Sequence, residues 1–339
     1  MTNVPDFDDL PTVKGMPQGC AWSIFDKDGK KDIYGTLNHL TPDVIKAAYK
    51  ELREGVSVSL NWPIGAIQSP GFGRKGLDHK VINLADALKC HGYDDEVSFN
   101  TQCSSQWDSL CHFHHQPTQT AYQGVKTNVK ELTQMGADGY VPNLDLPTLD
   151  HWHARGGLVA RGVFIDYKLY ADENGISWNP YTNDKITVED LEKVAKKQGV
   201  EFKPGDVIII RSGFTEGLTG QSGDVQAELM GSHKVCGVYG TIDTAKWFWN
   251  KRFAAVAGDM IAFEQIPSVD ENGQPLGIDG LVLHQYFLAL FGMSIGELWD
   301  LKALSETCKK LGRYSFLLTS SPLNVPGSVG SPPNALALF

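Results

Sequence analysis

The residues best suited to chemistry lie close together in residues 101–112, with the sequence TQCSSQWDSLCH. Alternate positions of this segment carry polar side chains: Gln102, Ser104, Gln106 and Asp108. In an extended chain all four point to one face of a strand, where amides, a hydroxyl and a carboxylate could bind a polar ligand. This face either lines a pocket or is the solvated face of an amphipathic strand, and the spacing alone favours neither.

Three histidines follow, His112, His114 and His115. Positions 112 and 114 share a strand face but 114 and 115 do not, so a metal site made of all three is not expected. Cys111 precedes His112 directly and would point to the opposite face, which argues against a thiol–imidazole pair. We therefore expect Cys103 and Cys111 to be small buried side chains.

Two glycine motifs match functional patterns but lack the required context. Residues 71–76, GFGRKG, match the dinucleotide pattern G-x-G-x-x-G, which needs a strand before it and a helix after it. Ser69-Pro70 precedes it and no helix pattern follows, so we expect a mobile surface loop. Residues 292–296, GMSIG, match the nucleophile elbow, but no histidine follows His284, whereas α/β-hydrolases place theirs after the serine. A serine hydrolase is the less favoured interpretation.

The elements that must position these residues alternate between helices and strands. Capping residues, glycine stops and apolar spacing predict helices over residues 43–54, 188–198, 243–252, 280–291 (capped by Asp279) and 301–311. Strands are predicted over residues 56–62, 162–167, 206–211, 253–257 and 314–319. This alternation indicates an α/β fold. No linker is evident, so we expect a single domain over residues 1–339.

Both ends of the chain are predicted to be arms of that domain, comprising the first ~30 residues and residues 322–339. The last residues, ALALF, are apolar, so we expect this end to pack on a neighbouring subunit.

Composition excludes several classes of partner. The 339 residues carry a net charge of -10, which disfavours binding to nucleic acid. The acidic N-terminus does not resemble a signal peptide, and the apolar run over residues 281–293 is too short to span a membrane. The six cysteines are widely spaced, without a C-x-x-C pair. We expect a cytoplasmic protein without nucleic-acid or membrane partners.

The segment from Gln102 to His112 resembles the motif H-x-G-T-H-x-D-x-P-x-H of the metal-dependent cyclase or hydrolase family, which includes kynurenine formamidases and isatin hydrolases. Asp108 and His112 match the Asp and the last His, whereas Gln102 and Gln106 stand where the first two histidines are usual. The resemblance continues through residues 161–167, 204–213, 254–259, 283–284 and 295–301. It runs from about residue 35 to the C-terminus and is carried by the order of these segments.

The resemblance implies a swivelling β/α/β fold, with a mixed sheet or flattened barrel flanked by helices, and assembly as a homodimer or homotetramer. It also implies a divalent metal, because family members bind one or two ions. One site uses the two motif histidines, which are glutamines here, and an amide oxygen is a weaker ligand than an imidazole. The other site corresponds to Asp108, His284 and Glu297, which implies one ion, Zn or Mn. Asp259 and Glu264 are candidates for supporting carboxylates or helix caps.

The implied activity is hydrolysis of an amide, lactone or related cyclic acyl bond in a small molecule. The eight tryptophans suggest aromatic pocket walls and thus an aromatic substrate. His112 would act as general acid or base, while Gln102 and Gln106 orient water or polarise a carbonyl. Two alternatives stay open. One is a metal-free enzyme using His112 and Asp108 as an acid/base pair. The other is a non-catalytic small-molecule binding protein on the same fold, which the two glutamines favour.

Overall fold

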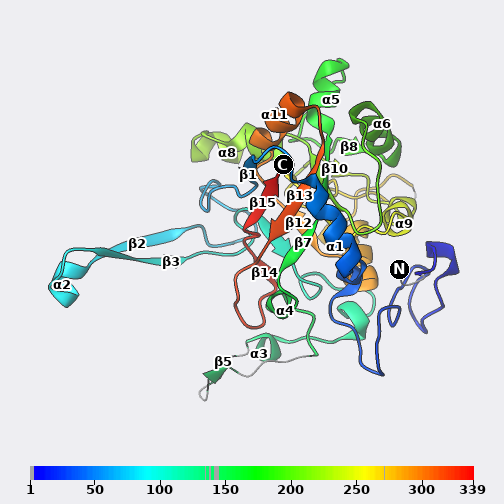
Figure 1. Ribbon diagram of the computed structural model, residues 1–339, viewed down its shortest axis with the longest axis horizontal. Coiled ribbons are helices and arrows are strands. Elements are labelled where there is room, and N and C mark those ends of the chain that lie inside the picture. Colours follow the sequence, from blue (N-terminus) through cyan, green and yellow to red (C-terminus); the bar gives the residue numbers. More distant parts are fainter. Residues whose placement is uncertain (1–3, 134, 137–138, 141–144, 271) are drawn as a thin grey trace.

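The structure, a computed structural model, describes residues 4–133, 135–136, 139–140, 145–270 and 272–339. Nine strands form one mixed, curved sheet in the order β1-β15-β13-β7-β9-β11-β12-β4-β14 (Figure 1). The strands are β1 (Ser57–Ser59), β4 (Gln106–Asp108), β7 (Leu158–Asp166), β9 (Val207–Arg211), β11 (Ala255–Gly258), β12 (Ile295–Glu297), β13 (Ser315–Ser320), β14 (Gly330–Ser331) and β15 (Ala335–Leu338). The four central strands, β7, β9, β11 and β12, run parallel to one another. Antiparallel strands extend the sheet on both sides of them. The predicted mixed sheet flanked by helices is therefore confirmed.

Helices cover both faces of the sheet, because its central strands are apolar on both faces. Ile208 and Ile210 of β9 pack in one hydrophobic cluster with α6 (Val188–Gln198) and α9 (Ile242–Asn250). Val207 and Ile209 point the other way, into a second cluster that includes α11 (Lys302–Leu311) and the edge of α1 (Pro42–Ala48). The Ile-rich segment predicted as a buried strand is thus the centre of the fold.

The predicted helices and strands are present, with shifts at their ends. The helix expected over residues 43–54 is shorter, since α1 passes into a 3-10 turn, η3 (Tyr49–Glu51). α6 has the expected Thr187 cap, in a capping box with Asp190, and ends at Gly199 in the left-handed region. The other helices are η1 (Phe7–Asp9), η2 (Gly35–His39), α2 (Leu84–Leu88), η4 (Tyr122–Gly124), α3 (Val129–Leu132), α4 (His151–Ala154), α5 (Tyr167–Glu173), α7 (Phe214–Leu218), α8 (Gly223–Met230) and η5 (Ile278–Gly280). The short strands outside the main sheet are β2 (Asp78–Asn83), β3 (Tyr93–Ser98), β5 (Met135–Gly136), β6 (Gly139–Tyr140), β8 (Lys185–Ile186) and β10 (Gly237–Val238).

The apolar segment near His284 differs from its prediction. A short helix, α10 (Val282–His284), passes into a π-helical turn, η6 (Gln285–Phe291), which ends at Gly292. Asp279 does not cap this helix. Instead, the carboxylate of Glu264 accepts the backbone N–H groups of Val282, Leu283 and His284. π-Helical turns occur frequently at functional sites.

The apolar C-terminal end also differs from its prediction. We expected it to pack on a neighbouring subunit, but β15 pairs with β1 and β13 of its own sheet. Ala335, Ala337 and Phe339 are fully buried there, because small alternating apolar residues fit an interior strand. The single-domain organisation stays a prediction.

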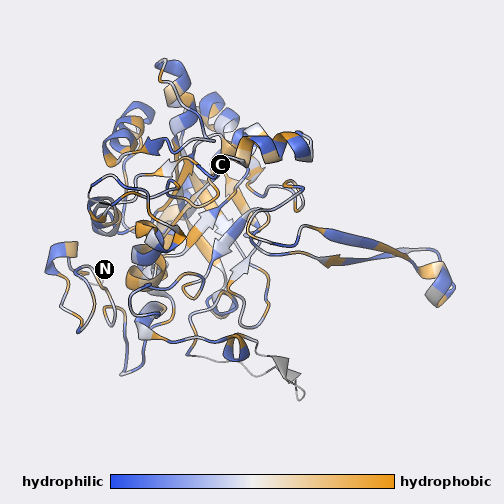
Figure 2. Cartoon of the chain, turned by 180° about the vertical axis from the view of Figure 1, so that it is seen from behind, coloured by the Kyte–Doolittle hydropathy of each residue, from blue (hydrophilic) through white to orange (hydrophobic). Residues whose placement is uncertain are grey.

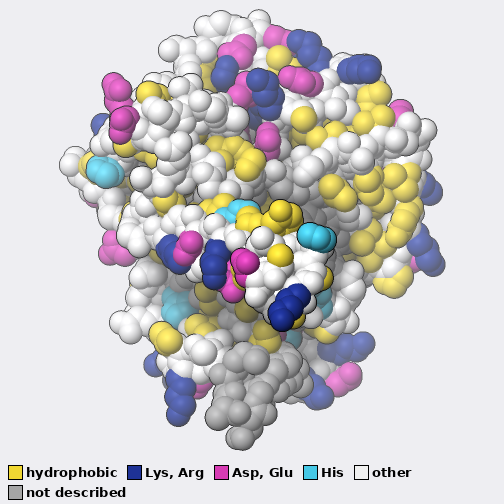
Figure 3. All heavy atoms as spheres, turned by 90° about the vertical axis from the view of Figure 1, so that its left-hand side faces the viewer, with side chains coloured by type: hydrophobic (Ala, Val, Ile, Leu, Met, Phe, Trp, Pro, Cys, Tyr) yellow, Lys and Arg dark blue, Asp and Glu magenta, His cyan; other side chains and the backbone are white. Residues whose placement is uncertain are grey.

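A long hairpin formed by β2, α2 and β3 extends away from the body of the protein (Figure 1). Its residues are mixed in hydropathy (Figure 2), and Figure 3 shows the hairpin end-on, with its tip toward the viewer. Val81, Tyr93 and Val97 share one face of its two-stranded sheet and are all exposed, with Tyr93 at 74%. The sequence patterns did not predict this hairpin. In the described part of the chain, no helix is long and apolar enough to cross a bilayer.

Candidate active site

β4 and β12 are adjacent antiparallel strands, and their pairing brings two polar residues face to face. Gln106 lies opposite Glu297 in the register. Trp107 points to the other face, where its ring packs 5.0 Å from Trp299 and its Nε1 donates to Ser320. The buried tryptophan therefore fixes β4, so that Gln106 and Asp108 both point away from it, as the alternation predicted.

Two glutamine amides link the carboxylates on this face. Gln106 Nε2 donates to Gln102 Oε1 and to Glu297 Oε2, each at 2.6 Å. Gln102 Nε2 donates in turn to Asp108 Oδ1, also at 2.6 Å. All four side chains are buried. The glutamines thus hold the two carboxylates in place through neutral donors.

The predicted row of four polar side chains is only partly present. Strand β4 begins at Gln106, and Gln102 reaches the same face from a turn rather than from a strand. The Ser104 hydroxyl donates instead to the carbonyls of Trp62 and Pro63. Ser104 is therefore a structural residue, because the chain turns before β4 and breaks the alternation.

His284 comes from α10, and Glu264 sets its orientation. The ring Nδ1 lies 2.9 Å from Glu264 Oε1, and Nε2 lies 3.3 Å from Glu297 Oε1. Glu264 is itself fixed by the three backbone N–H groups of α10. A Cβ at position 240 would lie 2.5 Å from Glu264 Oε2, so Gly240 leaves the space that this carboxylate occupies. Glu264 is therefore both a helix cap and a support for His284, whereas the sequence left these two roles as alternatives.

Burial and charge perturb the protonation of these groups. Burial raises the pKa of Glu297 to about 7, and the charge of Asp108 adds to this. Burial opposes the charged form of His284, but the hydrogen bonds and charges of Glu264 and Glu297 outweigh it and raise its pKa to about 10. Burial lowers the pKa of His112, despite the opposing charge of Asp108. His112 is therefore a neutral imidazole at neutral pH.

The donor set fits a divalent cation. Asp108, His284 and Glu297 each offer a ligand atom, and these atoms all lie within 4.8 Å of one another. Two buried acceptor oxygens of this centre, Gln106 Oε1 and Asp108 Oδ2, have no hydrogen-bond donor, and Glu297 Oε1 has only the ion-pair contact with His284 Nε2. Buried acceptors without a partner are costly, and a cation would satisfy them. Carboxylate and amide oxygens with one imidazole suit Mn²⁺, while Zn²⁺ also accepts such ligands.

A pocket of about 600 Å³ opens onto this centre. Gln102, His112, His284 and Glu297 are among its lining residues, and most of the others are apolar. The apolar lining includes Phe72, Phe113, Met230, Ile261 and Leu281. A largely apolar pocket with a few convergent polar groups is typical of a small-molecule site.

The remaining candidate residues from the sequence either border the candidate metal centre or have other contacts. His112 Nε2 is 3.9 Å from Asp108 Oδ1, so His112 borders the centre. Cys111 is buried and burial raises its pKa to about 12, which keeps the thiol protonated. His114 and His115 instead interact with threonines. The predicted elbow motif does not form an elbow, because Ser294 is buried and precedes strand β12 rather than a helix.

One wall of the pocket was missed at the sequence level. The loop over residues 71–76 was expected to be a simple surface loop, yet Phe72 and Arg74 both line the pocket. The one sequence pattern in this loop, the dinucleotide-like glycine spacing, relates to a different chemistry. Phe72 and Arg74 reach the pocket because of the path of the chain into β2, which no local pattern revealed.

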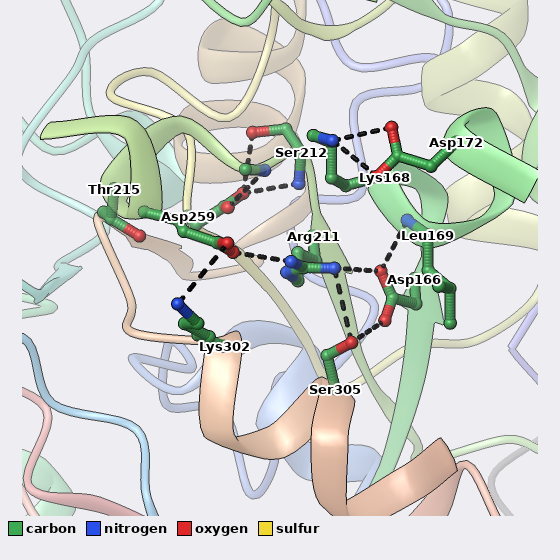
Figure 4. Close-up of polar contacts among 12 residues, drawn as sticks. Asp166, Lys168, Leu169, Asp172, Arg211, Ser212, Thr215, Asp259, Lys302 and Ser305 are labelled. Carbon is green, nitrogen blue, oxygen red and sulfur yellow. Dashed lines mark hydrogen bonds and ion pairs between the residues drawn. The ribbon is translucent and has the colours of Figure 1, made fainter. Parts of the chain in front are cut away.

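A second polar cluster, buried except for Glu216, lies at the ends of β7 and β9 (Figure 4). Its centre is Arg211, whose guanidinium donates to Asp166 and to Glu216. Ser305 donates to the other oxygen of Asp166. Nearby, both oxygens of Asp259 accept hydrogen bonds from Ser212 and the Gly213 N–H. We call the group Asp166, Arg211, Glu216 and Ser305 the Arg211 cluster.

The curved mixed sheet and its buried histidine–carboxylate centre define an α/β protein with a pocket of enzyme type. A family model described as "Putative cyclase" matches residues 33–265, more than half of the chain. The chain therefore belongs to this cyclase family, as its motif predicted. Among curated protein sequences, no significant match was found.

Solved structures show the same fold. A crystal structure of a novel cyclase shares 29% identity at a TM-score of 0.74, covering 91% of this chain and 96% of that one. Isatin hydrolase A from Ralstonia solanacearum shares 16% identity at a TM-score of 0.56, covering 88% and 98%. An isatin hydrolase bound to the product analogue thioisatinate shares 15% identity at a TM-score of 0.54, covering 87% and 95%. The cyclase-like fold is confirmed, and membership of the family supports a hydrolase or cyclase function.

Proposed function

We propose that this protein is a metal-dependent hydrolase or cyclase that cleaves or closes an amide, lactone or related cyclic acyl bond of a small molecule. One observation carries the proposal. Asp108, His284 and Glu297 converge within 4.8 Å, and Asp108 has a buried acceptor oxygen without a donor. Two like-charged carboxylates buried this close need a cation or a proton between them.

A single divalent ion, Mn or Zn, is the proposed cofactor, with Asp108, His284 and Glu297 as its ligands. The oxygen-rich donor set favours Mn²⁺ over Zn²⁺. When bound, such an ion would act as a Lewis acid and would lower the pKa of a water molecule. The support of His284 by Glu264 is typical of metal-binding histidines, in which a carboxylate fixes the ring through its other nitrogen.

His112 is the proposed general base. It borders both the pocket and Asp108, and its lowered pKa keeps the imidazole ready to accept a proton at neutral pH. After bond cleavage it would return that proton to the leaving group. Gln102 and Gln106 would act indirectly, because their amides are engaged in holding the carboxylates. This differs from the role in water or carbonyl orientation that the sequence suggested for them.

We also propose that the chain forms a homodimer or homotetramer through the β2–β3 hairpin. A two-stranded hairpin alone is marginally stable in water, and this one exposes Val81, Tyr93 and Val97 on one face. Burial of that face against a second copy would stabilise it. Location in the cytoplasm and a kynurenine formamidase-like substrate stay predictions.

Metal analysis of the purified protein tests the proposal. We expect about one equivalent of Mn or Zn in the wild type, and none in an Asp108→Ala/His284→Ala double variant, because its two ligands are lost. Asp43→Ala is the control, since it removes an exposed carboxylate on α1, away from both the site and the hairpin. Hydrolysis of a panel of aryl lactones and amides should follow the metal content.

The other outcomes identify the alternatives. One is that the protein hydrolyses substrates without binding metal even after supplementation. If His112→Ala abolishes that hydrolysis, the result would indicate the metal-free enzyme. Neither metal nor hydrolysis, together with tight binding of small molecules, would indicate a binding protein. Either result overturns the metal-dependent proposal.

A further inference from the structure

Arg74 lines the pocket without an acidic partner. Its guanidinium carbon lies 5.1 Å from the centre of the Phe72 ring, within the loop that precedes β2. Among the residues that the structure describes, no carboxylate forms an ion pair with Arg74 and no acceptor receives a hydrogen bond from its side chain. Arg161, Arg211, Arg252 and Arg313 each pair with an acidic side chain. Within the described residues Arg53 and Arg155 form no such pair either, but neither of them lines the pocket.

The surroundings of Arg74 make this cation suited to a ligand. The pocket wall is mostly apolar and Arg74 is half-buried, so its charge is screened less there than on an open surface. The exposed ring of Phe72 makes a cation–π contact with the guanidinium, which does not neutralise it. Arg74 is therefore able to bind an anion.

The residues that line the pocket carry charges of both signs. Glu297 lines it, Asp108 is hydrogen-bonded to the lining residue Gln102, and both carboxylates disfavour an anionic group close to them. Arg74 attracts such a group to its own wall. This polarity would orient an asymmetric ligand, with its reacting bond near Glu297 and His112 and its anionic end near Arg74.

We propose that Arg74 is a specificity-determining residue that binds a carboxylate of the substrate, whose apolar body occupies the pocket. This inference rests on the proposed function and names its substrate class, an apolar monocarboxylate with a hydrolysable acyl bond. A single guanidinium matches a carboxylate with two parallel hydrogen bonds. A phosphate dianion would call for further donors, and the wall around Arg74 is apolar.

Binding of a matched ligand pair tests the inference. The probes are 3-phenylpropionate and its neutral isostere 3-phenylpropionamide, measured by calorimetry on the full-length protein after removal of metal by chelation. We expect the wild type to bind the carboxylate at least ~10-fold more tightly than the amide, as for a charge-assisted pair. Arg74→Gln should abolish this preference and change the amide affinity by less than about twofold.

Two further variants serve as controls. Lys75→Gln removes the adjacent positive charge, but Lys75 pairs with Asp78 and Ser98 on the hairpin and does not line the pocket. It should keep the full preference for the carboxylate. Arg74→Lys retains the charge without the planar pair of donors, so we expect an intermediate preference. Circular dichroism of each variant checks that it is folded.

The outcomes separate this inference from the proposed function. A preference that persists in Arg74→Gln would overturn the role of Arg74, and so would a wild type without any preference. Neither result depends on hydrolysis or on bound metal. Conversely, a protein without metal or activity that still shows the Arg74-dependent preference would overturn the proposed function and leave the carboxylate site intact.

Discussion

Two buried acidic clusters lie on the same sheet and differ in what neutralises them. In the Arg211 cluster, Asp166 Oδ1 accepts hydrogen bonds from Arg211 and from the Leu169 N–H, and its second oxygen accepts from Ser305. In the candidate active site, the described residues supply no donor to Asp108 Oδ2, and Glu297 Oε1 has only the ion-pair contact with His284. The first cluster contains its own cation, whereas the second depends on a proton at His284 or Glu297.

The difference indicates which cluster is structural and which is functional. Both clusters carry the cost of burying charge, and a folded protein offsets this cost with paired, hydrogen-bonded partners. The Arg211 cluster meets this condition within the chain. In the candidate active site the buried carboxylates are only partly paired, and the site opens onto a pocket. This arrangement is expected where a ligand supplies the missing partner.

The largest expected effect concerns the Arg211 cluster. Arg211→Met should destabilise the protein by about 3–5 kcal/mol, because it leaves Asp166 buried without its cation. Urea unfolding followed by circular dichroism measures this change in the free energy of unfolding. Ser305→Ala, which removes only a neutral donor, should cost about 1 kcal/mol. If Arg211→Met lowered the free energy of unfolding by less than Ser305→Ala does, a structural role for the cation would be contradicted.

The candidate active site should respond in the opposite way. Glu297→Gln removes one of two neighbouring charges, so the metal-free protein should be as stable as the wild type or more stable. The same variant should lose the stabilisation by Mn²⁺, which for the wild type is about 2.7 kcal/mol at a concentration of 100 Kd. Thermal unfolding with and without Mn²⁺ measures both effects.

Glu216→Gln in the Arg211 cluster is the matched control for this experiment. It is the same substitution at a carboxylate bound to Arg211, so its response to Mn²⁺ should equal that of the wild type. The comparison between the clusters would fail if both variants responded to Mn²⁺ alike.

A smaller effect is expected from the support of His284. Glu264→Gln should weaken metal affinity by about 10- to 100-fold, because the neutral amide no longer polarises the ring and holds α10 less firmly. Competition with a fluorescent chelator measures the affinity. Asp259→Asn, at a carboxylate that accepts only from Ser212 and Gly213, should leave it unchanged. An equal loss in both variants would assign the effect to general destabilisation.

Much of this architecture could be predicted from local sequence. β9 is a run of apolar residues between a turn and a charged end, and α6 has a capping threonine and a terminal glycine. These patterns are formed by residues close together in the sequence, so they predict the element without knowledge of its tertiary contacts. The sequence also predicts Gln106 and Asp108 on one face, because they stand at alternate positions of an extended segment. In the structure, the buried Trp107 between them points the other way.

Other features depend on contacts that no local pattern encodes. Ser104 was assigned to the polar face, but the chain turns before β4 and directs its hydroxyl to Trp62. The apolar end of the chain forms β15 because it pairs between β1 and β13 of its own sheet. Arg74 joins the pocket only through the path of its loop. These outcomes arise between segments far apart in sequence, where composition cannot distinguish one partner from another.

The smallest expected effect is the change of catalysis with pH near neutrality, which depends on His112. Because burial lowers its pKa below the ordinary ~6.5, His112 is largely neutral above that pH and can act as a base. For a substrate that the protein hydrolyses, kcat/KM should therefore fall by less than about twofold from pH 8 to pH 6.5, and then by ~10-fold per unit below the pKa. His112→Gln should remove this decline together with most of the activity. Ser305→Ala should keep the wild-type profile, since the Arg211 cluster does not take part in proton transfer. A decline that begins above pH 6.5 and persists in the residual activity of His112→Gln would assign the titrating group to another residue of the candidate active site.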